Sequence, residues 1–337
     1  MAFRVAVSMV VVGLASAGLA ANAQPGGRLL VAVKGSQSLA IVDSGSGSVV
    51  ASVPEGAAAK DTGHEVAASL DGKRAFVPIY GDSGVGKPGT DGHEMVVIDI
   101  ASQKVVARVD FGHAVRPHFP AFNSKDGLLY VTTELDKSLT IVDPKTLKIV
   151  GQVPTGSAES HMLAISHDGK RGYTANVGPG TVSVLDLVGR KTIKVIPVAG
   201  QVQRISISMD DKLVFTSDQT KPELDVIDTA TNTVIKRIPM ESFGYGTAPT
   251  PDGRWLLVPM MNVNKVAVID LKTLTVARNV DLAAGTHPQE ALVRPDGKAA
   301  YVSCDHSGQV AEIDTATWTV RRMIDTGKVS DGLAWAR

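Results

Sequence analysis

The sequence lacks several features that would have placed it in a functional class. It has one cysteine, Cys304, so no disulfide can form within the chain and its stability must come from a hydrophobic core. Its 34 Lys and Arg residues balance 34 Asp and Glu residues, which argues against a nucleic-acid or anionic-membrane partner. Beyond the N-terminal region, no apolar run is long enough to cross a bilayer.

The signatures of common catalytic and cofactor sites are also missing. The chain has no G-x-S-x-G, H-E-x-x-H or P-loop motif, and no C-x-x-C-H for covalent heme. The three tryptophans do not recur at one repeat position, as docking of pyrroloquinoline quinone (PQQ) would require. The sequence therefore predicts no NAD, heme or PQQ cofactor.

The N-terminal segment has the pattern of a secretory signal. Arg4 is followed by an apolar run and then by Ala21-Asn22-Ala23, which reads as an A-x-A cleavage site. The prediction is a signal peptide over residues 1–23 and a single exported domain over 24–337, periplasmic or secreted. An uncleaved membrane anchor is the alternative, although the apolar run is short for a bilayer span.

The rest of the chain is built from a repeat of about 42 residues. Six full units cover residues 62–327, and each contains a turn such as "HDGKRGYTAN" followed by a run such as "VSVLDLVGRKTIKVI". Asp-Gly suits a tight hairpin because Gly tolerates positive φ, and the alternation of apolar and polar residues is typical of antiparallel strands. Four short strands in a repeat of this length predict a β-propeller blade.

The two ends of the repeat region complement each other. Residues 28–54 supply three strands of a unit without the first, and residues 328–337 supply a first strand with nothing after it. We therefore predict an all-β fold, a monomeric seven-bladed β-propeller with four antiparallel strands per blade. The ring would be closed by pairing of the N- and C-terminal strands, which leaves no exposed edge there.

The units resemble the YVTN-repeat family of bacterial surface-layer and periplasmic propellers. The similarity rests on the pattern "SxDGKxxYVxN…VxVIDxxTxxV" and covers nearly all of residues 24–337. The strand endings "VPIY", "VTTE", "VPMM" and "VSCD" depart from the family's usual "VAN". This family is functionally mixed, so the resemblance implies a fold and a location but no activity.

Propeller topology predicts which face of the ring carries function. The starts of the innermost strands and the ends of the second strands share one face, at the mouth of the central channel. The starts supply His64, His118, His161, Arg204, Tyr245, Gln289 and Asp331, with Glu65, Glu290 and His287 beside them. The ends supply Tyr80, Glu134, Asn176, Asp218, Met261, Asp305, His306 and Lys34. The long loop 81–94, which carries His93, lies on the same face, and long loops in compact domains are often functional.

Histidines at equivalent positions of consecutive blades suggest a divalent transition metal, for which neutral imidazole is a good ligand. The expected ligands are His64, His118, His161, Glu65 and His287. The expected ligand or substrate is a small molecule, and the residues expected to bind it are Arg204, Tyr245, Gln289, Glu290, Arg116 and His93.

Two further hypotheses remain open beside a metal-assisted hydrolase or lyase. The stretch "RPHFPAF…YVTTELDKSLTIV" is similar to lactonase-type propellers, which implies metal-free hydrolysis by His118 and Glu134. In either enzyme reading the catalytic candidates are His118, Glu134, His161 and His64. The other hypothesis is a non-enzymatic binding or scaffold propeller, and the sequence does not decide whether the protein is an enzyme.

Overall fold

A computed structural model describes residues 1, 26–56, 58 and 62–337. The predicted signal peptide, apart from Met1, and its cleavage site lie outside these residues. No helix within the described ranges is long and apolar enough to span a membrane.

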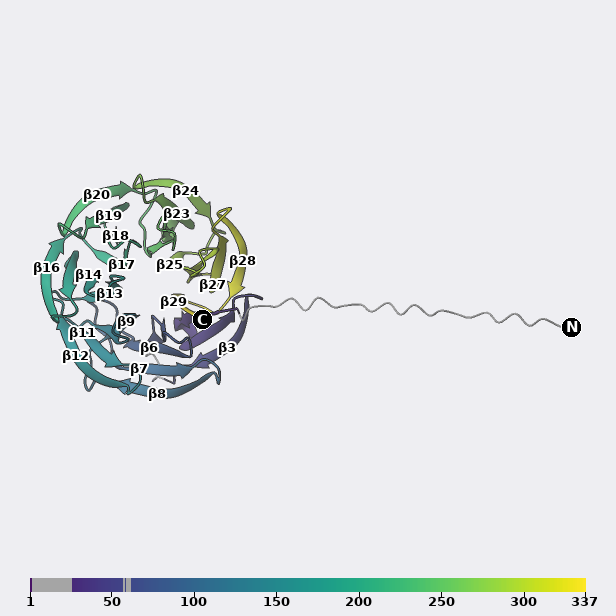
Figure 1. Cartoon of the computed structure of the whole chain (residues 1–337), viewed down its shortest axis with the longest axis horizontal. Helices are drawn as coiled ribbons and strands as arrows, with labels where there is room; N and C mark the ends of the chain where they lie inside the picture. The colour runs from purple at the N-terminus through teal and green to yellow at the C-terminus, as the bar shows by residue number, and fades with distance from the viewer. Residues whose placement is uncertain (2–25, 57, 59–61) are drawn as a thin grey trace.

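The described strands form seven antiparallel sheets, which are the seven blades of a propeller and confirm the predicted fold. Figure 1 shows them around one axis, with β9, β17, β25 and β29 toward the centre and β8, β16 and β24 on the circumference. From the innermost strand outward, the first three blades are β29 (Ser330–Ala336), β1 (Arg28–Val33), β2 (Ser38–Asp43), β3 (Ser48–Pro54); β4 (Thr62–Gly63) with β5 (Ala67–Ala68), β6 (Arg74–Gly81), β7 (Asp91–Asp99), β8 (Lys104–Asp110); and β9 (Pro117–Phe122), β10 (Leu129–Thr133), β11 (Ser138–Asp143), β12 (Lys148–Pro154).

The remaining blades follow the same order. Blades 4 to 7 are β13 (Ser160–Ile165), β14 (Arg171–Asn176), β15 (Thr181–Asp186), β16 (Lys191–Pro197); β17 (Val202–Ile207), β18 (Leu213–Asp218), β19 (Glu223–Asp228), β20 (Thr233–Pro239); β21 (Ala248–Pro249), β22 (Trp255–Met260), β23 (Lys265–Asp270), β24 (Thr275–Asp281); and β25 (Pro288–Val293), β26 (Ala299–Cys304), β27 (Gln309–Asp314), β28 (Thr319–Asp325). Two short 3-10 turns, η1 (Lys34–Ser36) and η2 (Met261–Val263), follow β1 and β22.

The core lies between neighbouring blades. Middle strands such as β10 are buried along their whole length, whereas outer strands such as β12 bury few residues. One apolar cluster joins Met162 and Tyr173 of blade 4 to Val202 and Ile205 of blade 5. Each fully buried Val, Leu or Ile side chain contributes about 1.5–3 kcal/mol. The ring is therefore stabilised by stacking of blade on blade and needs no disulfide, and Cys304 is a buried free thiol.

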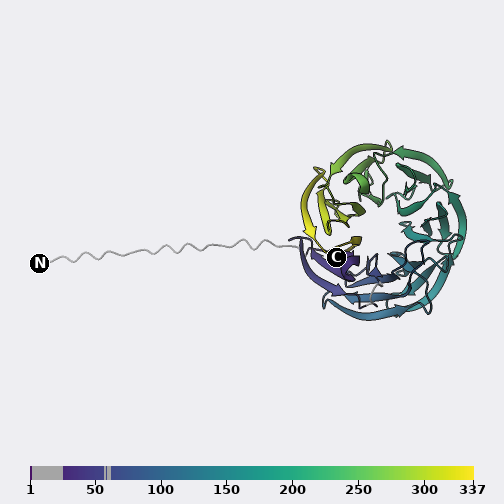
Figure 2. The ribbon, with the colours of Figure 1, turned by 180° about the vertical axis from the view of Figure 1, so that it is seen from behind.

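The ring closes through the first and last strands. In blade 1, β29 pairs antiparallel with β1, with Leu29 opposite Trp335 and Val31 opposite Leu333. Figure 2 shows the same closure from behind, where the C-terminus lies beside the N-terminal blade. This pairing confirms the predicted closure.

A β-bulge recurs near the start of the innermost strand. In blade 3, Pro117 lies opposite Thr133 and Pro120 opposite Val131, so the innermost strand contains one extra residue there. The same shift occurs in blades 1, 4, 5 and 7. A bulge changes the direction of side chains, and in these five blades it lies where the innermost strand approaches the axis.

Candidate functional site

The bulges define two sets of equivalent residues. In blades 2 to 7, the turn between the innermost strand and the second strand begins with a residue whose backbone N–H donates to the carbonyl five positions later, for example Ser166 to Arg171. Counting back five residues from each turn start, and using the strand register for blades 1 and 2, gives the axial ring: Asp331, His64, His118, His161, Gln203, Tyr245 and Gln289. The next residue of each strand gives the inner ring: Gly332, Glu65, Phe119, Met162, Arg204, Gly246 and Glu290.

One predicted member of the axial ring was assigned to the wrong position. The prediction placed Arg204 beside the three histidines, but Gln203 occupies that position. In blade 5 the turn reads Met-Asp-Asp-Lys, and Asp211 (φ 60°) takes the left-handed position that Gly169 (φ 73°) takes in blade 4. The turn must therefore be counted from Asp210.

The three axial histidines come together with Tyr80. The rings of His118 and His161 stack with centroids 3.5 Å apart, and His64 contacts His118 edge-on at 5.6 Å. His64 also stacks on Tyr80 at 4.7 Å. Blades 2, 3 and 4 therefore deliver one continuous group of rings, here called the histidine group (His64, His118, His161 and Tyr80).

Glu134 supports this group from β10's end. It accepts a hydrogen bond from the hydroxyl of Tyr80 at 2.9 Å and pairs through its other oxygen with Nδ1 of His161. Arg116 lies 3.8 Å away. Glu134 makes no hydrogen bond to His118, the other residue of the hypothesised metal-free hydrolase, in the described chain; Nδ1 of His118 instead bonds to the backbone carbonyl of His161 at 3.1 Å.

Burial keeps two of these imidazoles neutral. It lowers the pKa of His64 to about 3, and nearby Lys34 acts in the same direction. Burial and the adjacent His161 hold the pKa of His118 well below its usual range. Both rings therefore keep a nitrogen lone pair at neutral pH, as a metal ligand requires.

The inner ring is dominated by one cation. The guanidinium of Arg204 (blade 5) crosses the axis to Glu65, and it lies 2.8 Å from Glu290 and 3.0 Å from Asp331, so it joins blades 1, 2 and 7. Asp331 also pairs with Lys34 at 2.9 Å. Arg204 is thus surrounded by carboxylates of the protein, which leaves it little capacity to bind a small-molecule ligand, the role expected from the sequence.

The carboxylates around Arg204 differ in their pKa. Burial raises the pKa of Glu65 to about 8 and that of Glu290 to about 7, although Arg204 opposes both shifts. Burial would also raise the pKa of Asp331, but Lys34 and Arg204 lower it to about 2. Of the three, Asp331 is the one held ionised at neutral pH.

A separate group lies at the rim of blade 7. His287 bonds through Nδ1 to Asp305 at 2.6 Å and stacks on exposed His306 at 3.9 Å, while Gln289 donates to Asp305 at 2.7 Å. Within the described residues, His287, Asp305 and His306 are the group of three whose ligand atoms lie within 4.8 Å of one another. The predicted metal set of His64, His118, His161, Glu65 and His287 does not assemble in this way.

The long loop is held down by Arg116. Its guanidinium bonds to Asp91 at 2.7 Å and to the carbonyls of Gly84 and Lys87 at 3.3 Å. Arg116 therefore anchors the loop, a role that the sequence did not suggest. His93 is exposed in β7 and makes no side-chain hydrogen bond within the described chain.

Comparison with known proteins identifies relatives. Residues 89–320 match the family described as cytochrome D1 heme domain. A dihydro-heme d1 dehydrogenase of Pseudomonas aeruginosa is 32% identical over 117 residues, which are 34% of this chain and 23% of the relative, so the match spans about a quarter of that protein.

Two solved structures share the fold. Hydrazine synthase of Kuenenia stuttgartiensis superposes with a TM-score of 0.69 at 20% identity, covering 83% of this chain and 92% of that one. A dihydro-heme d1 dehydrogenase in complex with DHE has a TM-score of 0.66 at 16% identity, covering 92% and 75%. At these identities the likeness shows the propeller fold alone.

The matches correct two predictions. The family that matches is a heme-domain family, so the expectation of a transition metal without heme is wrong. The covalent-attachment motif on which that expectation relied is not needed by a non-covalent heme. The resemblance to YVTN propellers is confirmed only for the seven-bladed fold.

The residues present fit a heme iron at one position. His118 has its Nδ1 fixed by the carbonyl of His161, and its Nε2 has no hydrogen-bond partner in the described chain. Metal-bound histidines usually have their other ring nitrogen fixed in this way. The imidazole of His118 is buried, and the rings of His64 and Tyr80 pack against it edge-on, with centroids 5.6 Å and 5.1 Å away.

Proposed function

Because the chain belongs to the cytochrome D1 heme domain family, we propose that this propeller binds a heme-type macrocycle at the axial ring, with His118 as the residue that would hold the iron. The observation that carries the proposal is the free Nε2 of a neutral, anchored imidazole in the histidine group. A bound heme would supply an iron centre for ligand exchange or one-electron chemistry.

The surrounding residues would orient His118 rather than react. Glu134 receives a hydrogen bond from Tyr80 and pairs with His161, which fixes the ring against which His118 stacks. Burial of His118 keeps protons from competing for its lone pair. Because the protein's own carboxylates surround Arg204, the neutral axial residues Gln203, Tyr245 and Gln289 would contact the edge of the macrocycle.

We place the protein outside the cytoplasm because of the predicted signal peptide, and we treat it as a monomer. The similarity to dihydro-heme d1 dehydrogenases supports binding or processing of a heme-type ligand and gives no support to a metal-assisted hydrolase. If the protein binds no heme-type ligand in the following experiment, the alternative hypothesis of a scaffold without a ligand is favoured.

The test is a titration of the purified protein with ferric heme and, separately, with iron-free protoporphyrin. We expect the heme absorption band to shift with a stoichiometry of one. The shift should be lost in His118→Gly and restored by free imidazole, which can occupy the vacated position. His113→Gly, at an exposed histidine paired with Asp136, is the matched control and should bind as the parent does.

Three outcomes would overturn the proposal. One is that neither compound binds. Another is that iron-free protoporphyrin binds as tightly as heme, because the iron would then contribute nothing. The last is that imidazole fails to restore a folded His118→Gly variant, which would show that another residue holds the iron.

A further inference from the structure

On the face opposite the axial ring, the turn between the first two strands of a blade packs closely against the preceding blade. At the glycine of the turn, a methyl group would touch the preceding blade, so little space remains there. The contacts would be Gly72 to Arg337 at 2.4 Å, Gly169 to Asn123 at 2.5 Å, Gly253 to Met209 at 3.6 Å and Gly297 to Pro251 at 3.8 Å.

The junction between blades 2 and 3 is the exception. A methyl group on Gly127 would meet nothing within 4 Å. In this turn the Asp-Gly pair stands one position later than in blade 4, since the N–H of Gly127 bonds to Asn123 four residues back, whereas that of Gly169 bonds to Ser166 three residues back. The carboxylate of Asp126 then accepts a hydrogen bond from the hydroxyl of Tyr130 at 2.8 Å.

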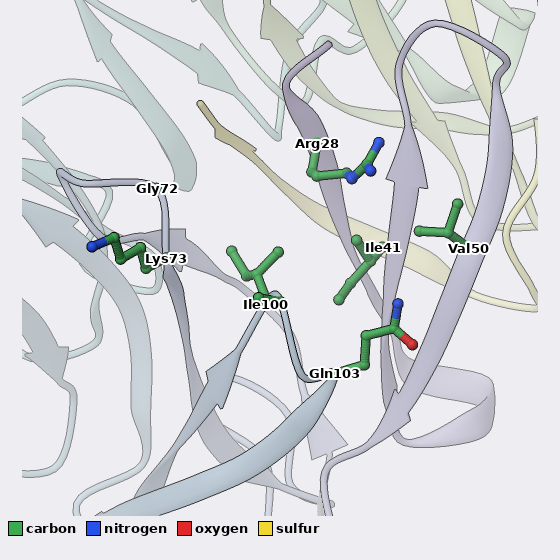
Figure 3. Close-up of a pocket in the computed structure, with 8 residues that line it drawn as sticks. Arg28, Ile41, Val50, Gly72, Lys73, Ile100 and Gln103 are labelled. Carbon is green, nitrogen blue, oxygen red and sulfur yellow. The ribbon is translucent and has the colours of Figure 1, made fainter. Parts of the chain in front are cut away.

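This displaced turn borders a cavity of about 640 Å³, here called the blade 2–3 cavity. Cavities of roughly 300–1,000 Å³ are typical of small-molecule sites. The neighbouring junction between blades 1 and 2 holds a smaller cavity of about 270 Å³, lined by Arg28, Ile41 and Gln103 (Figure 3). The larger cavity is therefore tied to the exceptional turn of blade 3.

The blade 2–3 cavity has an apolar part. Phe122 lies in its wall and packs edge-on against Phe76, with ring centroids 5.4 Å apart. Leu70 stands at its border with an exposed fraction of 54%, which is high for a large apolar side chain. An aromatic ring bound here would cover both Leu70 and Phe122.

Three cations line the same cavity: Lys73, Arg74 and Lys145. None of them has an ion pair within 4.0 Å in the described chain, and Arg74 reaches only the carbonyl of Pro144, at 3.5 Å.

The two carboxylates of the lining are engaged within their own turns. Asp71 accepts from the hydroxyl of Ser69 at 2.6 Å and from the N–H of Lys73 at 3.2 Å, and Asp99 accepts from Ser102 at 2.7 Å. These hydrogen bonds lower the pKa of both carboxyl groups, and Lys73 and Arg74 lower it further only at a distance, through electrostatic attraction, so neither cation is held in a direct ion pair in the described chain.

We propose that the blade 2–3 cavity is a second binding site, for a small aromatic anion whose ring lies on Leu70 and Phe122 and whose charge meets Lys73 and Lys145. It is independent of the heme-type site because it lies on the opposite face of the ring. Unpaired cations beside an apolar wall select a molecule with both properties.

The test uses 1-anilinonaphthalene-8-sulfonate as the probe, with binding followed by fluorescence. We expect one saturable site that survives His118→Gly and weakens with salt. Lys145→Glu, at a residue that lines this cavity but not the smaller one, should weaken binding about fivefold to tenfold. Lys73→Glu should do the same.

The chain offers matched controls at the same turn positions of other blades. Lys170→Glu corresponds to Lys73→Glu, and Lys272→Glu corresponds to Lys145→Glu. Both controls should leave the affinity within about twofold of the parent. The proposal is overturned if the probe does not bind, if the controls weaken binding as much as the cavity variants, or if inorganic sulfate competes as well as benzenesulfonate.

Discussion

His118 and His161 stack with their ring centroids 3.5 Å apart, and the Nδ1 of His118 lies 3.1 Å from the backbone carbonyl oxygen of His161. The two residues hold the same position in neighbouring blades, so the geometry follows from the repeat itself. Two stacked imidazoles cannot both carry a charge at low cost, and burial removes water that would screen them. His64 and His118, whose pKa values are lowered by burial, should therefore resist protonation, which has a measurable consequence for stability.

The free energy of unfolding should fall as the pH drops below about 6.5. The pKa of His64 falls from its ordinary value of 6.5 to about 3 in the folded protein, so between these values the unfolded chain binds the extra proton. Stability is then lost with decreasing pH, by at most about 1.4 kcal/mol per pH unit for this group. Chemical denaturation from pH 7 to 4 should show a shallower slope in His64→Gln. An unchanged slope in His64→Gln, or an equal change in His113→Gln, would contradict this assignment.

The contribution of Glu65 to the free energy of unfolding should fall as the pH rises from about 4.5 to 8, and it opposes the contribution of His64 between about 4.5 and 6.5. The pKa of Glu65 rises from 4.5 to about 8 on folding, so between these values the folded chain binds the extra proton and stability decreases as the pH increases. We expect Glu65→Gln, which cannot titrate, to flatten the decline measured by denaturation from pH 5 to 8. Glu241→Gln, which removes an exposed carboxylate, controls for a general charge effect. A decline as steep in Glu65→Gln as in the parent would show that Glu65 is not its source.

Replacement of Arg204 by leucine should be strongly destabilising. It would leave Glu65, Glu290 and Asp331 close together without their common cation. Breaking a buried pair typically costs about 3–5 kcal/mol. Urea denaturation should show this loss, and the double variant Arg204→Leu/Glu65→Gln should recover part of it because the two sites are coupled.

A half-exposed arginine gives the comparison for Arg204. Arg321 pairs with Asp314 and Glu312 at the edge of blade 7, with 42% of its side chain exposed. Arg321→Leu should cost no more than about 1 kcal/mol. Equal losses in the two variants would mean that the network across the axis adds nothing to stability.

Tyr80→Phe should cost about 1–3 kcal/mol, since it removes a hydrogen bond of 2.9 Å to the buried carboxylate of Glu134. Thermal or urea unfolding would measure the loss. Tyr173 is equally buried but makes no side-chain hydrogen bond within the described chain, so Tyr173→Phe should be nearly neutral. If the two substitutions cost the same, the hydrogen bond from Tyr80 is not what stabilises the pair.

The sequence predicted the ring, its closure and the three histidines at one mouth because these features repeat. A period of four strands fixes the blade, and equivalent residues of each blade must meet at the axis. The bulge recurs at the same place in blades 1, 3, 4, 5 and 7, which keeps this spacing there. The prediction failed in blade 5, where Asp211 takes the position that glycine holds in the turns of other blades. Counting back from Asp211 instead of Asp210 gave Arg204 the position that Gln203 occupies.

Contacts between distant blades could not be predicted in the same way. Arg204 and Glu65 are 139 residues apart, and no local pattern marks either as the other's partner. Glu134 likewise pairs with His161 of the next blade, whereas the sequence had grouped it with His118 of its own blade. The heme-type ligand was missed for a related reason, since a single anchored histidine has no spacing motif.

The pairing of β1 with β29 also sets an order for folding. Within the ring, β1 is synthesised before the other strands and its partner β29 after them, and Leu29 pairs with Trp335 only at that stage. Until then, β1 can pair only with β2, so the other edge of this apolar strand has no partner, and such edges are sites of misassembly. The intermediate blades can stack during synthesis, yet closure is a late and non-local step, which slows folding. Nascent chains stalled before β29 should therefore depend most on chaperones that shield exposed strands.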